Sequence, residues 1–220
     1  MATLLPLPGQ VASAAETIQT LVTGYQPVIS ERIDASGFKH PGIGFTKDIL
    51  ENMRTQVRAQ KEPWTTYINN MLTSSSALKA PTIKNVSGDP TKPKFYGLDS
   101  QGVESQFATD STIAYTQAIL YYVTGDETYR NNAMRVIRLY AQMDPARYAP
   151  YTDAHIHTGI PLSHMVGAAE ILRYTSTQTP ALAWTDDDTV NFTNNLVLPV
   201  VTTFNSCNCR FMNQHLYTTI

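Results

Sequence analysis

Three side chains with complementary chemistry stand close together near the end of the sequence. Asn213, His215 and Tyr217 place an amide, an imidazole and a phenol within five residues. An amide and an imidazolium can neutralise a carboxylate by hydrogen bonding, and an imidazole or a phenol can move a proton beside it. We therefore take Asn213 and His215 as candidate catalytic residues and interpret Tyr217 as a packing residue.

The segment just before this trio adds a positive charge and two thiols. Arg210 could lower the pKa of a nearby tyrosine, which ordinarily lies near ~10, and we take it as a candidate substrate-binding residue. Cys207 and Cys209 are too close for an unstrained mutual disulfide and too few for a zinc site. We expect free thiols or bridges to other sequence, and no metal.

A long connection from Thr73 to Val103 is rich in Ser, Pro, Gly, Asp and Lys. Connections of this length are often lids or binding loops. Lys84, Lys92, Lys94 and Tyr96 would suit a cover over an anionic ligand, and Lys94 and Tyr96 are candidate substrate-binding residues. A disordered surface excursion explains the same composition equally well.

The remaining histidines fall into two groups. His155 and His157 with Asp153 have side chains that can ligate metals, but their spacing is not diagnostic. We interpret this segment as a polar loop before a helix that lies either on the surface or along a cleft, with His157 as a candidate substrate-binding residue. His40, in an opening turn, and His164, beside an apolar helix face, are interpreted as structural.

Apolar residues at helical spacing predict successive helix hairpins. Thr46 can cap a helix that extends to Gln60, and Pro63 can begin its partner. The segment Glu104–Thr124 is apolar nearly all round and should be buried on several sides. Local signals predict the later boundaries. We expect Gly125 to end that helix and Asp126 to cap the next one. We expect Pro161 to open another helix, Asp186–Asp188 to begin the last one and Pro199 to kink it.

These helices predict an all-α fold, an (α/α) toroid or incomplete barrel of antiparallel hairpins. No segment alternates clearly enough to predict a strand. Gln106 and Asp110 begin the buried Glu104–Thr124 helix, where they either point into a cleft or cap the helix. Gln106 is therefore another candidate substrate-binding residue.

Composition excludes several classes of protein. A net charge of -2 argues against a general nucleic-acid binder, and the apolar stretches are too short to span a membrane. Sequons at Asn85 and Asn191 favour a secreted glycoprotein, although such triplets often arise by chance. We expect a secreted protein without nucleic-acid or membrane partners, and no oligomeric state is predicted.

Three segments carry a resemblance to a known family. They are Phe38-Lys39-His40-Pro41-Gly42-Ile43-Gly44-Phe45-Thr46 with Met53-Arg54 and Glu62-Pro63-Trp64, then Tyr121-Tyr122-Val123-Thr124-Gly125-Asp126 with Tyr129, and then Gly167-Ala168-Ala169-Glu170-Ile171-Leu172-Arg173. In this order and spacing the chain resembles the alginate-lyase-like family of polysaccharide lyases from about Phe38 to Tyr217.

The resemblance implies an (α/α) toroid that cleaves an acidic polysaccharide by β-elimination at uronate residues, with no obligatory cofactor. Asn213-Gln214-His215 matches the family's Asn-Asn-His-like segment, except that Gln214 replaces the second Asn. It also implies a domain over residues 38–220, after an extension of residues 1–37, that continues beyond the chain end with a catalytic Tyr and Arg. The polymer would be of the alginate or glucuronan type.

Two other classes of function stay open at this stage. The chain could be a helical carbohydrate-binding or scaffold module without a working proton relay. It could also be a glycoside hydrolase on a similar toroid, which would need two carboxylates across the scissile bond. Asp153 and Asp110 are the obvious carboxylates for that role.

Overall fold

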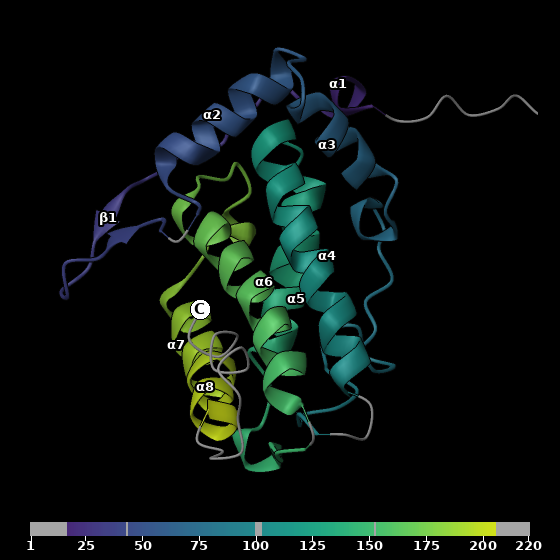
Figure 1. The fold of residues 1–220 in the computed structure, drawn as a ribbon, viewed down its shortest axis with the longest axis vertical. Helices are drawn as coiled ribbons and strands as arrows, with labels where there is room; N and C mark the ends of the chain where they lie inside the picture. Colours follow the sequence, from purple (N-terminus) through teal and green to yellow (C-terminus); the bar gives the residue numbers. More distant parts are fainter. Residues whose placement is uncertain (1–16, 43, 100–102, 152, 206–220) are drawn as a thin grey trace, which may run out of the picture.

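The computed structural model describes residues 17–42, 44–99, 103–151 and 153–205, and the described part of the chain is mostly α-helical (Figure 1). None of its helices has the length and apolarity needed to cross a membrane. In chain order the elements are α1 Ile18–Leu21, β1 Arg32–Ile33, β2 Lys39–His40, α2 Lys47–Arg58, α3 Trp64–Leu72, α4 Val103–Thr124, α5 Glu127–Tyr140, α6 Ala154–Tyr174, α7 Asp186–Phe192, a π-helical segment Thr193–Val197 and α8 Leu198–Asn205.

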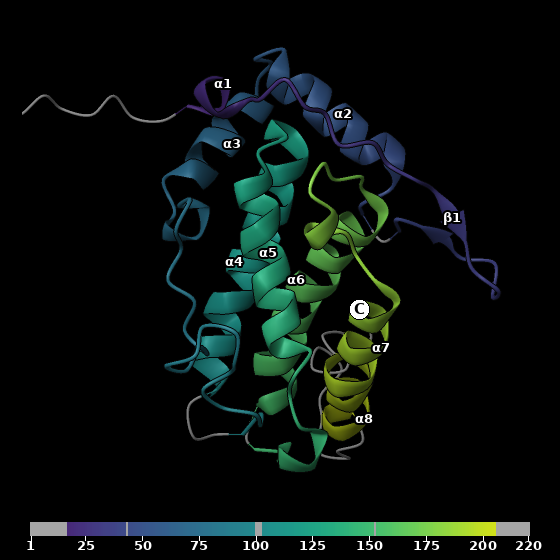
Figure 2. The ribbon, with the colours of Figure 1, turned by 180° about the vertical axis from the view of Figure 1, so that it is seen from behind.

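The helices α4, α5 and α6 run alternately up and down side by side, and α7 and α8 follow beside α6 (Figures 1 and 2). The pair α2 and α3 lies across the end of this group where α4 ends and α5 begins. The sequence analysis expected antiparallel hairpins throughout. α2 and α3 instead meet at an angle, while the later helices do alternate in direction.

The prediction that α4 is buried on several sides is confirmed. Nearly every side chain from Ile113 to Thr124 is buried, including the polar Gln117. Gly125 ends the helix with a positive φ of 78°, and a Cβ there would lie 2.0 Å from the carbonyl oxygen of Tyr25. The carboxylate of Asp126 then accepts the backbone N–H of Thr128 at 2.9 Å, so the expected cap of α5 is present.

Within the segment expected as an extension, residues 17–29 include side chains that are buried against the rest of the fold, whereas residues 30–37 are exposed. Ile18 and Leu21 are buried, and the backbone N–H of Ser30 donates to the carbonyl of Tyr174 at 2.8 Å. The sequence analysis also expected no strand. The two-residue strands β1 and β2 pair in antiparallel register, with Arg32 opposite His40.

The long connection between α3 and α4 is fastened along α4 and α5. The buried carboxylate of Asp110 accepts the backbone N–H groups of Lys84 and Asn85 at 2.7 and 2.9 Å and the hydroxyl of Tyr140 at 3.0 Å. Gln117 donates to the carbonyls of Ser76 and Leu78 near the start of the connection. These bonds hold the connection against α4 and α5 at several points, which argues against a lid that moves freely.

Asp110 therefore neither caps α4 nor points into an open cleft, which corrects both expectations. Burial raises the pKa of its carboxyl group, opposed by the hydrogen bonds it accepts. Since the folded-state pKa is raised, the free-energy cost of burying the charge is absent below the ordinary pKa and develops as pH rises through the folded-state value.

One sequon also belongs to this fastened connection. The side chain of Asn85 is fully buried; its amide donates to the carbonyl of Phe95 at 3.0 Å and its oxygen accepts the N–H of Phe95 at 2.8 Å. Because this side chain is completely buried, a glycan on Asn85 could not fit in the fold. The described structure leaves Asn191 as the exposed sequon asparagine.

The start of α6 was placed too late by the sequence analysis. Asp153 adopts a left-handed conformation with φ 60°, and the helix begins at Ala154, so Pro161 lies inside it. Proline has no N–H, so Pro161 cannot donate to the carbonyl of His157 four residues earlier. His155 and His157 consequently lie on a helix and not in a loop.

The expected break near Pro199 takes the form of a π-helical segment, Thr193–Val197, just before it. Pro199 cannot donate to the carbonyl of Asn195, and that carbonyl accepts the hydroxyl of Tyr148 at 2.6 Å. The amide of Asn195 in turn donates to the carbonyl of Ala141 at 2.7 Å. The α5–α6 connection is thereby tied to the last helices.

Substitution of Asp110 tests the fastening of the long connection. We expect Asp110→Ala to lower the free energy of unfolding by roughly 3 kcal/mol, because three buried donors lose their acceptor. Urea unfolding monitored by circular dichroism measures the loss. The control Asp187→Ala removes an exposed carboxylate from the first turn of α7 and should cost less than about 1 kcal/mol. Equal losses for the two variants would contradict this account.

Candidate functional site

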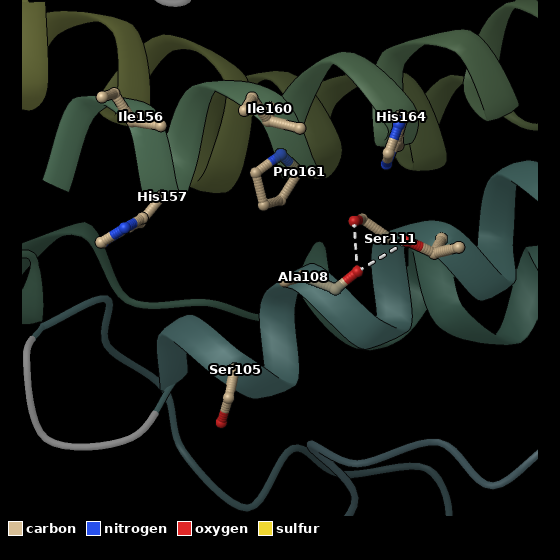
Figure 3. Close-up of a pocket in the computed structure, with 9 residues that line it drawn as sticks. Ser105, Ala108, Ser111, Ile156, His157, Ile160, Pro161 and His164 are labelled. Atoms are coloured by element: carbon tan, nitrogen blue, oxygen red, sulfur yellow. Dashed lines mark hydrogen bonds between the residues drawn. The ribbon is translucent and has the colours of Figure 1, made fainter. Parts of the chain in front are cut away.

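A cavity of about 230 Å³ opens between the first half of α4 and the first half of α6. Figure 3 shows His157, Pro161 and His164 directed from α6 toward α4. The lining is mostly apolar, and its polar groups are two imidazoles and three hydroxyls. The described lining residues are Ser105, Ala108, Ser111, Thr112, Ile156, His157, Ile160, Pro161 and His164.

His164 is a half-buried histidine in the lining of this cavity. Its ring stacks on Tyr115 with centroids 5.2 Å apart, and Tyr115 in turn meets the ring of Phe45 edge to face at 5.8 Å. Burial lowers the pKa of His164 below its ordinary value of 6.5. The imidazole is therefore neutral at neutral pH, and its buried Nδ1 has no hydrogen-bond partner among the described residues.

His157 lies seven residues before His164, so the two imidazoles share one face of α6. The ring of His157 stacks near that of Tyr151, with centroids 6.2 Å apart. The cleft-lining location expected for His157 agrees with its position in the cavity. Its role in substrate binding stays a prediction.

The hydroxyls on the opposite wall are held by their own helix. Ser111 Oγ and Thr112 Oγ1 both donate to the carbonyl of Ala108, at 3.0 and 2.9 Å (Figure 3). Their protons are thus occupied, while their oxygen lone pairs can still accept hydrogen bonds. The hydroxyl oxygens of the cavity can therefore accept hydrogen bonds from the hydroxyl groups of a sugar. The neutral imidazole of His164 could accept a proton from a carbon atom of the sugar ring.

The other candidate residues lie elsewhere. Asn213, His215 and Arg210 are outside the described residues. Gln106 is on α4, half-buried, with a buried Oε1 that has no partner among the described residues, but it does not line this cavity. Lys94 and Tyr96 do not line it either.

Lys94 and Tyr96 belong to the fastened connection. The ammonium group of Lys94 lies 5.1 Å from the centre of the Phe95 ring, and the guanidinium of Arg147 lies 5.8 Å from that of Tyr96. The carbonyl of Tyr96 accepts the N–H of Asp144 at 2.7 Å. Tyr96 is therefore placed against the α5–α6 connection, whereas the exposed Lys94 side chain lies near Phe95 of its own segment, and neither belongs to the described lining of the cavity.

Carboxylates do not contribute to the described lining. Both carboxylate oxygens of Asp110 accept hydrogen bonds from the long connection. Asp153 precedes α6 in an exposed position. Over residues 17–205, where described, no group of three or more His, Cys, Asp or Glu side chains is arranged to hold a metal ion.

Sequence reasoning missed the pairing of His164 with Tyr115, since His164 was interpreted as structural. One signal was available, because His157, Ile160 and His164 follow each other at helical spacing. That spacing was obscured by placing the helix start at Pro161. The stacking of Tyr115 depends on how α4 packs on α6, which helical spacing does not reveal.

Two of the segments that carry the family resemblance meet beside this site. The carboxylate of Glu170 contacts His40 Nδ1 at 3.0 Å and accepts the N–H of Gly42 at 2.9 Å. A Cβ at Gly167 would lie 2.8 Å from the ring of Phe45. The opening turn is thus docked on α6, and its Phe45 supports the Tyr115–His164 stack.

Comparison with known proteins gives no relative for this chain: no protein-family model, curated protein or solved structure matches it.

The pKa of His164 provides a test of the site. We expect NMR titration to give a value below the ordinary 6.5, because the half-buried ring is protonated at a cost in hydration. The folded-state pKa is depressed, so the associated stability is present above the ordinary value and is lost as pH falls through the folded-state value.

Tyr115→Ala should admit water to the imidazole and raise the pKa of His164 toward 6.5. Tyr67→Ala, which removes an exposed tyrosine on α3, is the matched control and should leave it unchanged. An unchanged value in the Tyr115 variant would show that stacking does not keep water from the ring.

Proposed function

We propose that this chain belongs to a polysaccharide lyase that cleaves a uronate polymer, of the alginate or glucuronan type, by β-elimination on an (α/α) toroid. The observation that carries the proposal is the half-buried His164, whose lowered pKa makes it a neutral base in a cavity lined by hydroxyls. The family resemblance supports the substrate class, and the alternating helices support the toroid. The polymer would be met outside the cell.

The reaction needs a base and a group that neutralises the uronate carboxylate. The proton at C5 is weakly acidic until the charge of the neighbouring C6 carboxylate is reduced. The base removes this proton, the C4–O4 bond breaks with its electron pair leaving on O4, and a double bond forms between C4 and C5. A proton passed to O4 completes the cleavage without consuming water.

His164 is suited to the removal of the proton, because it is neutral at the pH where the polymer is ionised. Asn213 and His215, in the segment that matches the family's Asn-Asn-His-like stretch, would neutralise the carboxylate, and Arg210, which is close to them in the sequence, would add a positive charge. This division gives the neutral and the charged imidazole different tasks. His157 would bind the chain beside the reacting sugar.

A glycoside hydrolase is less compatible with this cavity, because hydrolysis needs two carboxylates and the described lining has none. A non-catalytic sugar-binding module has one observation in its favour. The apolar surface of Ile156, Ile160 and Pro161 could pack against the C–H face of a sugar without any proton transfer.

Incubation with polyglucuronate and with alginate separates these functions. A lyase makes an unsaturated uronate, so ultraviolet absorbance should rise with time, whereas a hydrolase makes reducing ends without this band. A protein that binds both polymers without producing either product would be a non-catalytic module.

If elimination is found, His164→Gln and His215→Ala should each lower turnover by a factor on the order of 10², with little change in thermal stability. The control Lys61→Ala removes an exposed charge near the start of α3 and should keep full turnover. Activity should also fall as pH drops through the lowered pKa of His164, where its base form is lost. Full turnover in His164→Gln would exclude it as the base.

A further inference from the structure

The outer face of α5 carries a groove, lined by both polar and apolar side chains, that is separate from the cavity between α4 and α6. Asn131, Arg135, Arg138 and Gln142 follow at intervals of four, three and four residues, so they form one stripe along the helix and its end. At 1.5 Å per residue, this stripe is roughly 16 Å long. The groove has a volume of about 390 Å³, and its other lining residues are Pro90, Thr91, Met134, Leu139 and Leu182.

Two members of the stripe are already held in place. Arg138 forms two hydrogen bonds to the carboxylate of Asp188 at 2.8 and 2.9 Å, and these bonds raise its pKa. Gln142 donates to the carbonyl of Thr91 at 2.9 Å, and its oxygen accepts the ammonium group of Lys92 at 3.4 Å. The walls of the groove are therefore tied to α5.

Arg135 differs from Arg138 because its charge is not used by the fold. It is exposed, and its guanidinium makes no ion pair or hydrogen bond with any described residue. Asn131, one turn earlier, is also exposed. The charge of Asp188 is compensated by Arg138, so Arg135 gives the groove a positive surplus.

The groove also has apolar side chains in its lining. Pro90 is exposed and Leu182 is half-buried, so both present apolar surface, whereas Met134 and Leu139 are almost completely buried, at 1% and 2% exposure. A sugar ring has apolar C–H faces and polar edges, so it can pack on such a surface while its edges meet side chains around it. A guanidinium fork binds a carboxylate through two parallel hydrogen bonds, and planar amides suit hydroxyl groups.

We propose that this groove is a binding subsite for a uronate residue of an acidic polysaccharide. Arg135 takes the carboxylate, Asn131 meets the hydroxyls, and Pro90 and Leu182 support the ring. The choice of polymer rests on the proposed function. The groove would anchor the polymer outside the cavity that holds His164.

Direct binding measures this subsite without relying on turnover. We expect affinity electrophoresis of the full chain in gels of polyglucuronate or alginate to give a dissociation constant about tenfold larger for Arg135→Ala than for the parent protein. The reason is that a charge-assisted pair is lost. The difference should shrink as salt is raised, since the lost charge is exposed. Arg135→Lys keeps the positive charge but loses the two-pronged guanidinium, so its dissociation constant should lie between those of the parent protein and Arg135→Ala.

The matched control is Arg32→Ala, which removes an exposed arginine from β1 and should keep the parental affinity. A polymer with its carboxyl groups reduced to alcohols should bind the parent and Arg135→Ala equally weakly. Equal dissociation constants for Arg135→Ala and Arg32→Ala on both uronate polymers would overturn the subsite.

The outcomes for the subsite and for the lyase can be told apart. Binding that depends on Arg135, with no unsaturated product, would support the subsite and overturn the proposed reaction. Elimination by His164 with an affinity insensitive to Arg135 would support the reaction and overturn the subsite.

Discussion

The need to cover α4 on all sides governs the arrangement of the other elements. Residues 113–124 of this helix are almost entirely buried, and one neighbouring helix can cover only part of its circumference. α5 and α6 pack along it, the long connection is bonded to Asp110 and Gln117, and α2 contacts it near its end. Since burial of apolar surface is the main favourable term in folding, this helix sets the positions of its neighbours.

The candidate site lies where this cover is incomplete. Ser105 and Ala108, near the start of α4, are exposed, and the cavity opens beside them against α6. Farther along, the space between the helices is filled by aromatic rings: His164 stacks on Tyr115, and Tyr115 meets Phe45 edge to face. The cavity is thus bounded at one end by aromatic packing, and the same packing lowers the pKa of His164 by burial.

Local signals in the sequence predicted several elements well. Thr46 and Asp126 stand at the N-caps of α2 and α5, and Gly125 ends α4, as expected from their backbone preferences. Pro161 misled the analysis, because proline is common at the first position of a helix and here lies in the second turn. Only tertiary packing favours a helix that starts earlier and tolerates the missing hydrogen bond.

The long connection shows the limit of composition more clearly. Its Ser, Pro, Gly and Lys residues indicate a loop, and a loop is present. Composition cannot show that its backbone N–H groups reach the carboxylate of Asp110 or that Gln117 holds its carbonyls. These bonds join residues more than twenty positions apart, so the fastening and the pairing of Tyr115 with His164 required the folded structure.

The segments on which the proposed relation to a lyase family rests make mainly structural contacts in the described part of the chain. Glu170 holds the turn at His40 and Gly42, and Tyr121 donates its hydroxyl to the carbonyl of Ser176. Arg54 lies over the ring of Tyr122, 4.4 Å from its centre. Such contacts can maintain a common scaffold under different activities, because fold and chemistry are separable. These contacts concern the helical scaffold and not the reaction, so the proposal of a lyase depends on the imidazoles of His164 and His215.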